Sequence, residues 1–442
     1  MNDEREILGW TMYDWANSAF STTVVTALLG PYILALAQSS DTPLFLFGKA
    51  IEPAAIFPFA ASLSVFLQVF FLPILGTIAD YTNLKKKMML GFAYVGALAT
   101  IILFIVRADM PGIGTNGAVL LASLTMIIAN LCFGAAIVFY NAFLPDIASP
   151  GQRDTVSARG FAYGYLGGGL LLLANFGLLA TMNDTSLAVR ISLASAGAWW
   201  LLFTYLFPHQ RLRQRDAVRQ LPPGTTLFSH GIRQIVHTLK EIHARYPMTL
   251  RYLIAYLIYN DGIQTVIVVA TAFAADELGV ETQSLLILVL MIQFVAFGGA
   301  FLFGYLARRM GAKRAIMFSL AIWAAIVIYA YALLTNEVQL YVLGFFVALV
   351  LGGSQALSRS LFSQMSPADH EAEYFGFYEI SERGTSWLGP LAFAAAVQIT
   401  GSQRVAIVSL IIFFVVGLVL LARVDVKRAI VEVGNNPVGV VL

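Results

Sequence analysis

The chain has 442 residues, of which 59% are hydrophobic and only 12% are charged. A soluble domain carries about 25% charged residues, so this composition excludes an ordinary soluble protein. The formal net charge is only +2, and we expect no nucleic-acid partner.

Apolar stretches recur along the chain at lengths of about 20 to 25 residues, enough to cross a hydrocarbon core of about 30 Å. Only helices and closed barrels satisfy their backbone hydrogen bonds in lipid, and the sequence lacks the alternating pattern of barrel strands. We therefore predict an all-α integral membrane protein with twelve transmembrane helices. The spans are expected at about 8–37, 54–79, 86–107, 117–144, 157–181, 188–207, 248–273, 283–306, 313–334, 338–362, 374–399 and 403–423.

The longest polar stretch follows the sixth span and suggests a two-part organisation. We predict an N-terminal six-helix bundle at 1–207, a cytoplasmic linker at 208–247 and a C-terminal six-helix bundle at 248–442. The linker is expected to be a solvated tether, and a lipid-headgroup or regulatory role is the alternative. Its cations are Arg211, Arg213, Arg215, Arg219, Arg233, Lys240 and Arg245.

Lysine and arginine indicate the orientation, because they concentrate in cytoplasmic loops. With the N-terminus inside, the outer loops hold only Lys49, Arg107, Arg190 and Arg404. We therefore expect both termini to be cytoplasmic. The chain begins with MNDEREILGW, which is acidic where a signal peptide would be basic. The predicted location is the inner (plasma) membrane of a prokaryote.

The first span of each half carries an acid, an amide three residues later and a hydroxyl four residues later. Helical spacing places the three groups on one face. An acid at membrane depth costs several kcal/mol and is a functional hypothesis by default. We interpret the two sets as matching positions of an internal repeat that face a common cavity. They are Asp14, Asn17 and Ser18, and Asp261, Gln264 and Thr265.

Each acid has a structural alternative. Aromatic residues surround Asp14 in the sequence, which is also typical of an acid at the membrane interface. Asp261 lies about twelve residues into its span, or about 18 Å at 1.5 Å per residue, which is near the midplane. Its alternative role is a structural acid that is hydrogen-bonded inside the bundle.

The later spans add further polar groups. The tenth contains Gln355 and Arg359, and the eleventh contains Glu379, Glu382 and Arg383. Glu379 and Arg383 are four residues apart and can pair on one helical face, while Arg359 could reach either acid. These groups suit a structural or gating network, or a carboxylate or phosphate of a substrate. In the fifth span, glycines at every fourth position predict close helix packing: Gly160, Gly164 and Gly168.

The second span ends in Gly76, Asp80 and Lys85. This stretch resembles the G-x-L-A-D-R-x-G-R-K loop of the major facilitator superfamily, although Tyr81 and Asn83 replace its arginine and glycine. In that superfamily the loop acid helps to latch the two halves together, which implies a conformational latch at these three residues. The corresponding loop after the eighth span has Arg308 in place of the acid.

Four motifs together resemble one family, the autophagy-related vacuole effluxers and their bacterial "unknown major facilitator" relatives. The resemblance spans almost the whole chain and implies a major facilitator fold of two pseudo-symmetric six-helix bundles. Yeast-type members are described as exporters of neutral amino acids. The motifs are Tyr13 to Phe20 (YDWANSAF), Asn141 to Asp146 (NAFLPD), Tyr259 to Thr265 (YNDGIQT) and Gln355 to Phe362 (QALSRSLF).

We therefore predict a secondary active transporter, not an enzyme, that moves a neutral amino acid or short peptide by alternating access. The ammonium would face Asp261 and Asp14. The carboxylate would face Arg359 or Arg383 and the amides of Asn17, Asn260 and Gln264, and Gln355 is a further candidate. Protons would couple through Asp261 and Glu379, because a buried acid can load and release a proton.

Two rival functions remain open: an exporter or flippase of lipids or other amphiphiles, and a non-transporting membrane receptor. We expect no cofactor and no metal, since the single cysteine, Cys132, lies in an apolar run and the histidines fall in expected loops. The protein is expected to act as a monomer in the lipid bilayer, with protons and a small-molecule substrate as its partners.

Overall fold

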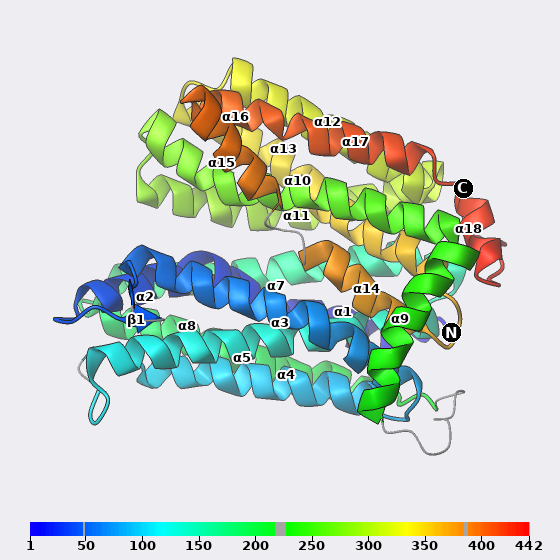
Figure 1. The fold of residues 1–442 in the computed structure, drawn as a ribbon, viewed down its shortest axis with the longest axis horizontal. Helices are drawn as coiled ribbons and strands as arrows, with labels where there is room; N and C mark the ends of the chain where they lie inside the picture. The colour runs from blue at the N-terminus through cyan, green and yellow to red at the C-terminus, as the bar shows by residue number, and fades with distance from the viewer. Residues whose placement is uncertain (47–48, 109, 217–226, 384–387, 442) are drawn as a thin grey trace.

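A computed structural model describes the chain except for residues 47–48, 109, 217–226, 384–387 and 442. Figure 1 shows two layers of long helices, with both termini at the same end of the molecule. We call this the terminal end. The opposite end, which we call the hairpin end, carries the short strands β1 (Phe45–Leu46) and β2 (Lys49–Ala50), paired antiparallel.

The first layer begins with one long span in which a π-helical stretch joins two α-helices. This stretch, η1 (Phe20–Leu28), lies between α1 (Glu4–Ala19) and α2 (Leu29–Gln38). The other elements of this layer are α3 (Pro53–Asp80), α4 (Lys85–Ile102), η2 (Leu103–Ile105), α5 (Gly114–Ala142), α6 (Leu144–Ile147), η3 (Pro150–Gln152), α7 (Arg153–Thr181), α8 (Thr185–Thr204) and η4 (Tyr205–His209).

The second layer follows the linker. It contains α10 (Pro247–Leu278), α11 (Thr282–Met310), α12 (Ala312–Ala332), α13 (Glu337–Gln364), α15 (Leu388–Thr400), α16 (Gln403–Ser409) and α17 (Ile411–Ala422). The short helix α18 (Val426–Glu432) follows at the terminal end. Polar side chains cap several helix starts: Asp184 accepts from Leu187 N in α8, and Asn336 accepts from Gln339 N in α13.

Eleven helical segments among the described residues are long and apolar enough to cross a membrane. They coincide with eleven of the twelve predicted spans to within a few residues. The predicted span at 374–399 is described as two helices, α14 (Glu371–Arg383) and α15, on either side of residues 384–387. Large apolar side chains on the outer faces, such as Phe59, Phe66 and Phe70 of α3, are exposed as expected for contact with lipid.

The linker differs from its prediction. The sequence predicted a polar loop, but residues 227–245 form α9 (Leu227–Arg245), which runs across both layers at the terminal end in Figure 1. Thr238 and Ile242 of this helix are buried. The Thr238 hydroxyl bonds to the carboxylate of Glu373 in α14. The linker is therefore not a purely solvated tether, while the domain limits at 207 and 247 stay predictions of the sequence.

The two layers meet along two seams. At one seam α7 packs against α11 and α13, and at the other α14 packs against α3 and α5. The glycine stripe of α7 faces α1, as the close-packing prediction requires. A Cβ atom at Gly164 would lie 2.7 Å from Ser18 Oγ, and one at Gly168 would lie 2.6 Å from Thr22 Oγ1. These positions therefore leave no space for a side chain.

Candidate functional site

An ion pair joins the two layers near the terminal end. The guanidinium of Arg359, on α13, lies 3.2 Å from Asp14 Oδ2, on α1. The Tyr140 hydroxyl on α5 donates to the same oxygen at 2.7 Å. Asp14 is only 7% exposed, so it is buried between helices and is not the interfacial acid of the alternative interpretation. The sequence suggested that Arg359 could reach Glu379 or Glu382, and the structure gives it Asp14 as its ion-pair partner.

Arg359 is fully engaged by protein groups. Its Nε donates to Ser157 Oγ at 2.9 Å, and its Nη2 donates to the carbonyl oxygen of Ser157 at 3.0 Å. The guanidinium also lies 4.7 Å from the ring centre of Trp10 and 4.2 Å from that of Phe161. These contacts hold a buried charge by pairing and hydrogen bonding. Arg359 therefore has no free donor fork for a substrate in this conformation.

A second ion pair lies on α14. Arg383 Nε donates to Glu379 Oε2 at 3.0 Å, which confirms that these two residues pair on one helical face. Glu379 is fully buried and also accepts from Asn141 Nδ2 at 2.9 Å. Asn141 Oδ1 in turn accepts from Arg359 Nη1 at 3.4 Å. One amide on α5 therefore connects the two ion pairs.

Unlike Arg359, Arg383 uses only one of its guanidinium nitrogens in a hydrogen bond to the described residues. Its guanidinium lies 4.9 Å from the ring centre of Phe133, on α5, and its side chain is 21% exposed. Among the described residues, Glu379 is the hydrogen-bond acceptor of Arg383, and it engages only Nε. The Nη1 and Nη2 groups thus form a fixed fork that suits a carboxylate.

Within the described part of the chain, Asp261 has no such counter-charge. It is 1% exposed, and neither of its carboxylate oxygens has a hydrogen-bond partner among the described residues. A Cβ atom at Gly389, near the start of α15, would lie 3.1 Å from Asp261 Oδ2, so this backbone packs directly against the carboxylate. Thr265 Oγ1 donates to the backbone carbonyl of Asp261 at 2.7 Å, within the helix. An unpaired ionised carboxylate at this burial is costly, which favours the neutral acid.

Asp261 and Arg383 flank a single hydrogen bond. Asn260 Nδ2 donates to the carbonyl oxygen of Glu382 at 2.9 Å. Each partner is the chain neighbour of one of the two charged residues. This bond joins α10 to α14 one residue before Asp261 and one residue before Arg383.

The remaining candidate residues occupy different positions. Asn17, on α1, is buried, and its Nδ2 has no acceptor among the described residues. Gln264 is half-buried on α10. Gln355, on α13, accepts from the Tyr165 hydroxyl of α7 at 2.6 Å, so it bridges the two layers. The expected common cavity for Asp14 and Asp261 stays a prediction.

The latch residues hold α14 against the first layer. Asp80, at the end of α3, accepts from the backbone N–H groups of Ala372 at 3.1 Å and Glu373 at 2.8 Å. These are first-turn donors of α14, so the carboxylate caps this helix across the seam. Gly76 allows the contact, because a Cβ atom there would overlap the carbonyl oxygen of Ala372.

Lys85 places a positive charge beside these acids. It lies 3.2 Å from Asp146 Oδ2, and it shares a polar pocket with Asp80 and Glu371 at the terminal end. Burial raises the pKa of the Glu371 carboxyl, and the nearby Lys85 ammonium opposes that rise. Lys85 is thus a counter-charge for the acids beside the latch.

Sequence reasoning missed two members of this network. Tyr140 and Ser157 bind Asp14 and Arg359, but neither stood out in the sequence. Asn141 opened a recognised motif, yet its role was not inferred. Asn141 is one of a few polar residues in the mostly apolar fourth span, which was the available signal, and the identities of its partners required the fold.

The fold is similar to those of solved membrane transporters. The structure of the human organic anion transporter MFSD10 (TETRAN) aligns with a TM-score of 0.67 at 14% identity, covering 95% of this chain and 99% of that one. The proton:xylose symporter XylE aligns with a TM-score of 0.66 at 13% identity, covering 98% and 97%. This is a multi-pass membrane protein with the predicted all-α major facilitator fold.

The chain belongs to the family described as vacuole effluxer Atg22 like, whose model matches residues 2–434. The MFS-type transporter YxiO of Bacillus subtilis (strain 168) is 34% identical over 422 residues, covering 94% of each chain. Autophagy-related protein 22 of Kluyveromyces lactis is 26% identical over 475 residues, covering 96% of this chain and 94% of that protein. The family resemblance is confirmed, and the protein is a major-facilitator-type transporter with a small-molecule substrate.

Proposed function

We propose that the protein is a proton-coupled carrier of a small zwitterion, a neutral amino acid or short peptide, that works by alternating access. The observation that carries this proposal is a buried carboxylate without a partner among the described residues, Asp261 on α10, and a guanidinium that bonds to them only through Nε, Arg383 on α14, on two helices that the Asn260–Glu382 bond joins. The free fork of Arg383 suits the carboxylate of the substrate. The Asp261 carboxylate would pair with the ammonium of the substrate. When the site is empty, the same carboxyl group would bind a proton.

The contacts that hold the two layers together support alternating access, and we call the Asp14–Arg359 pair the gate. In this structure the Asp14–Arg359 pair and the Asp80 cap of α14 hold the layers together near the terminal end. Both must separate if that end is to open. By the distribution of lysine and arginine, we assign the terminal end to the cytoplasm of a prokaryotic cell. The described conformation is then closed toward the cytoplasm.

Binding of three matched small molecules tests the substrate class. L-Alanine carries both charges, L-alaninamide lacks the carboxylate and propionate lacks the ammonium. We expect the purified protein to bind L-alanine at least about tenfold more tightly than either analogue, because a charge-assisted hydrogen bond is worth about 1.5–3 kcal/mol. The Arg383→Gln variant should lose the preference over L-alaninamide. Equal binding of all three molecules would contradict a zwitterion site.

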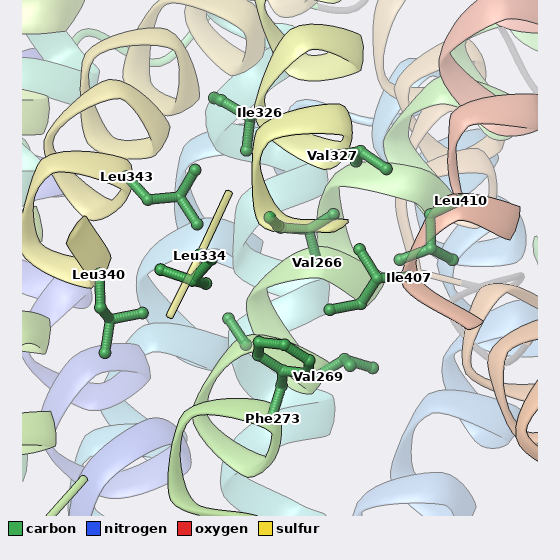
Figure 2. Close-up of a pocket in the computed structure, with 12 residues that line it drawn as sticks. Val266, Val269, Phe273, Ile326, Val327, Leu334, Leu340, Leu343, Ile407 and Leu410 are labelled. Carbon is green, nitrogen blue, oxygen red and sulfur yellow. The ribbon is translucent and has the colours of Figure 1, made fainter. Parts of the chain in front are cut away.

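An apolar pocket favours a second candidate, the export of amphiphiles. Figure 2 shows this pocket between α10, α12, α13 and α16, lined by aliphatic side chains and Phe273. Its first lining residue on α10, Val266, lies five positions after Asp261, or about 7.5 Å along the helix. The matching ligand class is a cationic amphiphile, whose ammonium would face Asp261. Binding of decylamine but not of L-alanine, abolished by Asp261→Asn, would favour this function.

A further inference from the structure

Asn141 lies where the two charged pairs of the site meet. Its side chain is buried on α5, in the first layer, while Arg359 and Glu379 come from helices that follow the linker. Its Nδ2 donates to Glu379 Oε1 at 2.9 Å, and its Oδ1 accepts from Arg359 Nη1 at 3.4 Å. The amide therefore contacts one member of the gate pair and one member of the Arg383 pair.

The charges on either side fix the orientation of this amide. Rotation by 180° would aim the Nδ2 donors at the guanidinium of Arg359 and the Oδ1 acceptor at the carboxylate of Glu379. Both contacts would then be repulsive, since a guanidinium has no acceptor and a carboxylate has no donor. Asparagine is suited to this position because it offers one donor and one acceptor without a charge. Aspartate would repel Glu379, and leucine would make neither bond.

We propose that Asn141 is the positioning residue that relays occupancy of Arg383 to the Asp14–Arg359 gate. This inference rests on the proposed function, in which a substrate carboxylate takes the free fork of Arg383. The carboxylate draws the Arg383 guanidinium away from Glu379, and Glu379 then attracts the Arg359 guanidinium that Asn141 holds beside it. Arg359 and Glu379 both lie on helices that follow the linker, so this attraction pulls Arg359 away from the first layer. Arg359 is then held less firmly by Asp14, and the terminal end can open.

The chain allows a clean reporter of gate opening. Cys132 is the only cysteine in the sequence, so Cys132→Ser gives a background without thiols. Ser363 is 1% exposed on α13, and its carbonyl accepts from Arg153 Nη1 at 2.7 Å across the gate. Ser363→Cys in this background should react with a water-soluble thiol reagent only when the terminal end opens.

A double-mutant cycle tests the relay without any substrate. Arg383→Gln frees Glu379 from its partner and should raise the labelling rate at the reporter at least about threefold, as expected for coupled neighbours. In the Asn141→Leu background the same change should alter the rate by less than about 1.5-fold. Asn130→Leu is the matched control, because Asn130 lies three turns earlier on α5 and bonds to Ser64. It should leave the effect of Arg383→Gln intact.

Different results would contradict the relay and the proposed substrate. Equal effects of Arg383→Gln with and without Asn141 would overturn the relay, and Asn141→Ala repeats the test if Asn141→Leu does not fold. Saturating L-alanine should also raise the labelling rate, and only when Asn141 is present. Coupling in the cycle without any response to L-alanine would uphold the relay and count against the zwitterion substrate. A response to L-alanine that survives Asn141→Leu would overturn the relay alone.

Discussion

At the scale of single residues, the two membrane-embedded arginines have different environments. Arg359 is 3% exposed, donates to Ser157 and Asp14, and is surrounded by aromatic rings. Arg383 is held through Nε alone and keeps a partly exposed fork. The sequence offered both as carboxylate ligands, because their helical positions gave no reason to separate them. The gate partner of Arg359, Asp14, is 345 positions away, and only the fold reveals it.

Arginine-to-lysine changes should distinguish these roles. Lysine keeps the charge but loses the planar fork, so Arg383→Lys should raise the KM for L-alanine by about tenfold or more. Arg359→Lys should instead leave the Kd for L-alanine within about threefold and change the rate of exchange, since it alters the gate. Radiolabelled uptake and equilibrium binding measure the two effects. A large loss of affinity in Arg359→Lys alone would reverse the assignment.

Exchanging the charges of Glu379 and Arg383 should restore part of the stability that a single charge reversal removes. Glu379→Arg removes the partner of a buried charge and should destabilise the protein by about 3–5 kcal/mol, as breaking a buried pair does. Adding Arg383→Glu should recover part of this loss. Thermal unfolding in detergent measures the recovery, independently of transport. A double variant no more stable than the worse single variant would show that the two residues are not energetic partners.

At the scale of elements, α14 is the helix on which the closed terminal end depends. Although it follows the linker in sequence, it packs against α3 and α5 of the first layer. Asp80 caps its start, and Asn141 and Phe133 contact its later turns. The sequence indicated the latch residues through a loop resemblance. It could not identify their partner as the first turn of another span.

A single methyl group should loosen this contact. In Gly76→Ala the added Cβ would overlap the backbone of Ala372, which cannot retreat as a flexible side chain could. Overpacking of this kind costs about 1–3 kcal/mol, so labelling at Ser363→Cys should rise several-fold. Gly91→Ala on α4 is the control, because a Cβ atom there meets nothing within 4 Å. Equal labelling in both variants would mean that the α3–α14 contact does not hold the gate.

The linker helix shows where composition misled the prediction. Residues 227–245 are polar enough to suggest a loop, yet they contain apolar residues at helical spacing, including Ile235, Leu239 and Ile242. The helix is stabilised by tertiary contacts, in particular the bond between Thr238 and Glu373. Polar and apolar residues balance in this segment, so it has no apolar run, and the helical spacing of its apolar residues was the signal that could have predicted the helix.

At the scale of the whole molecule, most of the fold followed from hydropathy. Lipid requires every span to satisfy its own backbone hydrogen bonds, so the helices could be located from apolar length alone. The pairing of spans could not, because any apolar helix face can pack against another. The contacts that position the site, such as Asp14–Arg359 and Asn260–Glu382, join residues more than 100 positions apart. They depend on how the two layers meet.

In the proposed mechanism, Asp261 carries the coupling proton of a zwitterion carrier. This role can be measured by uptake of L-alanine into proteoliposomes, with and without an imposed pH gradient. We predict that the gradient accelerates uptake by the wild-type protein and has no effect on Asp261→Asn, which keeps the shape of the side chain but cannot ionise. An Asp261→Asn protein that still responds to the gradient as the wild type does would contradict this role.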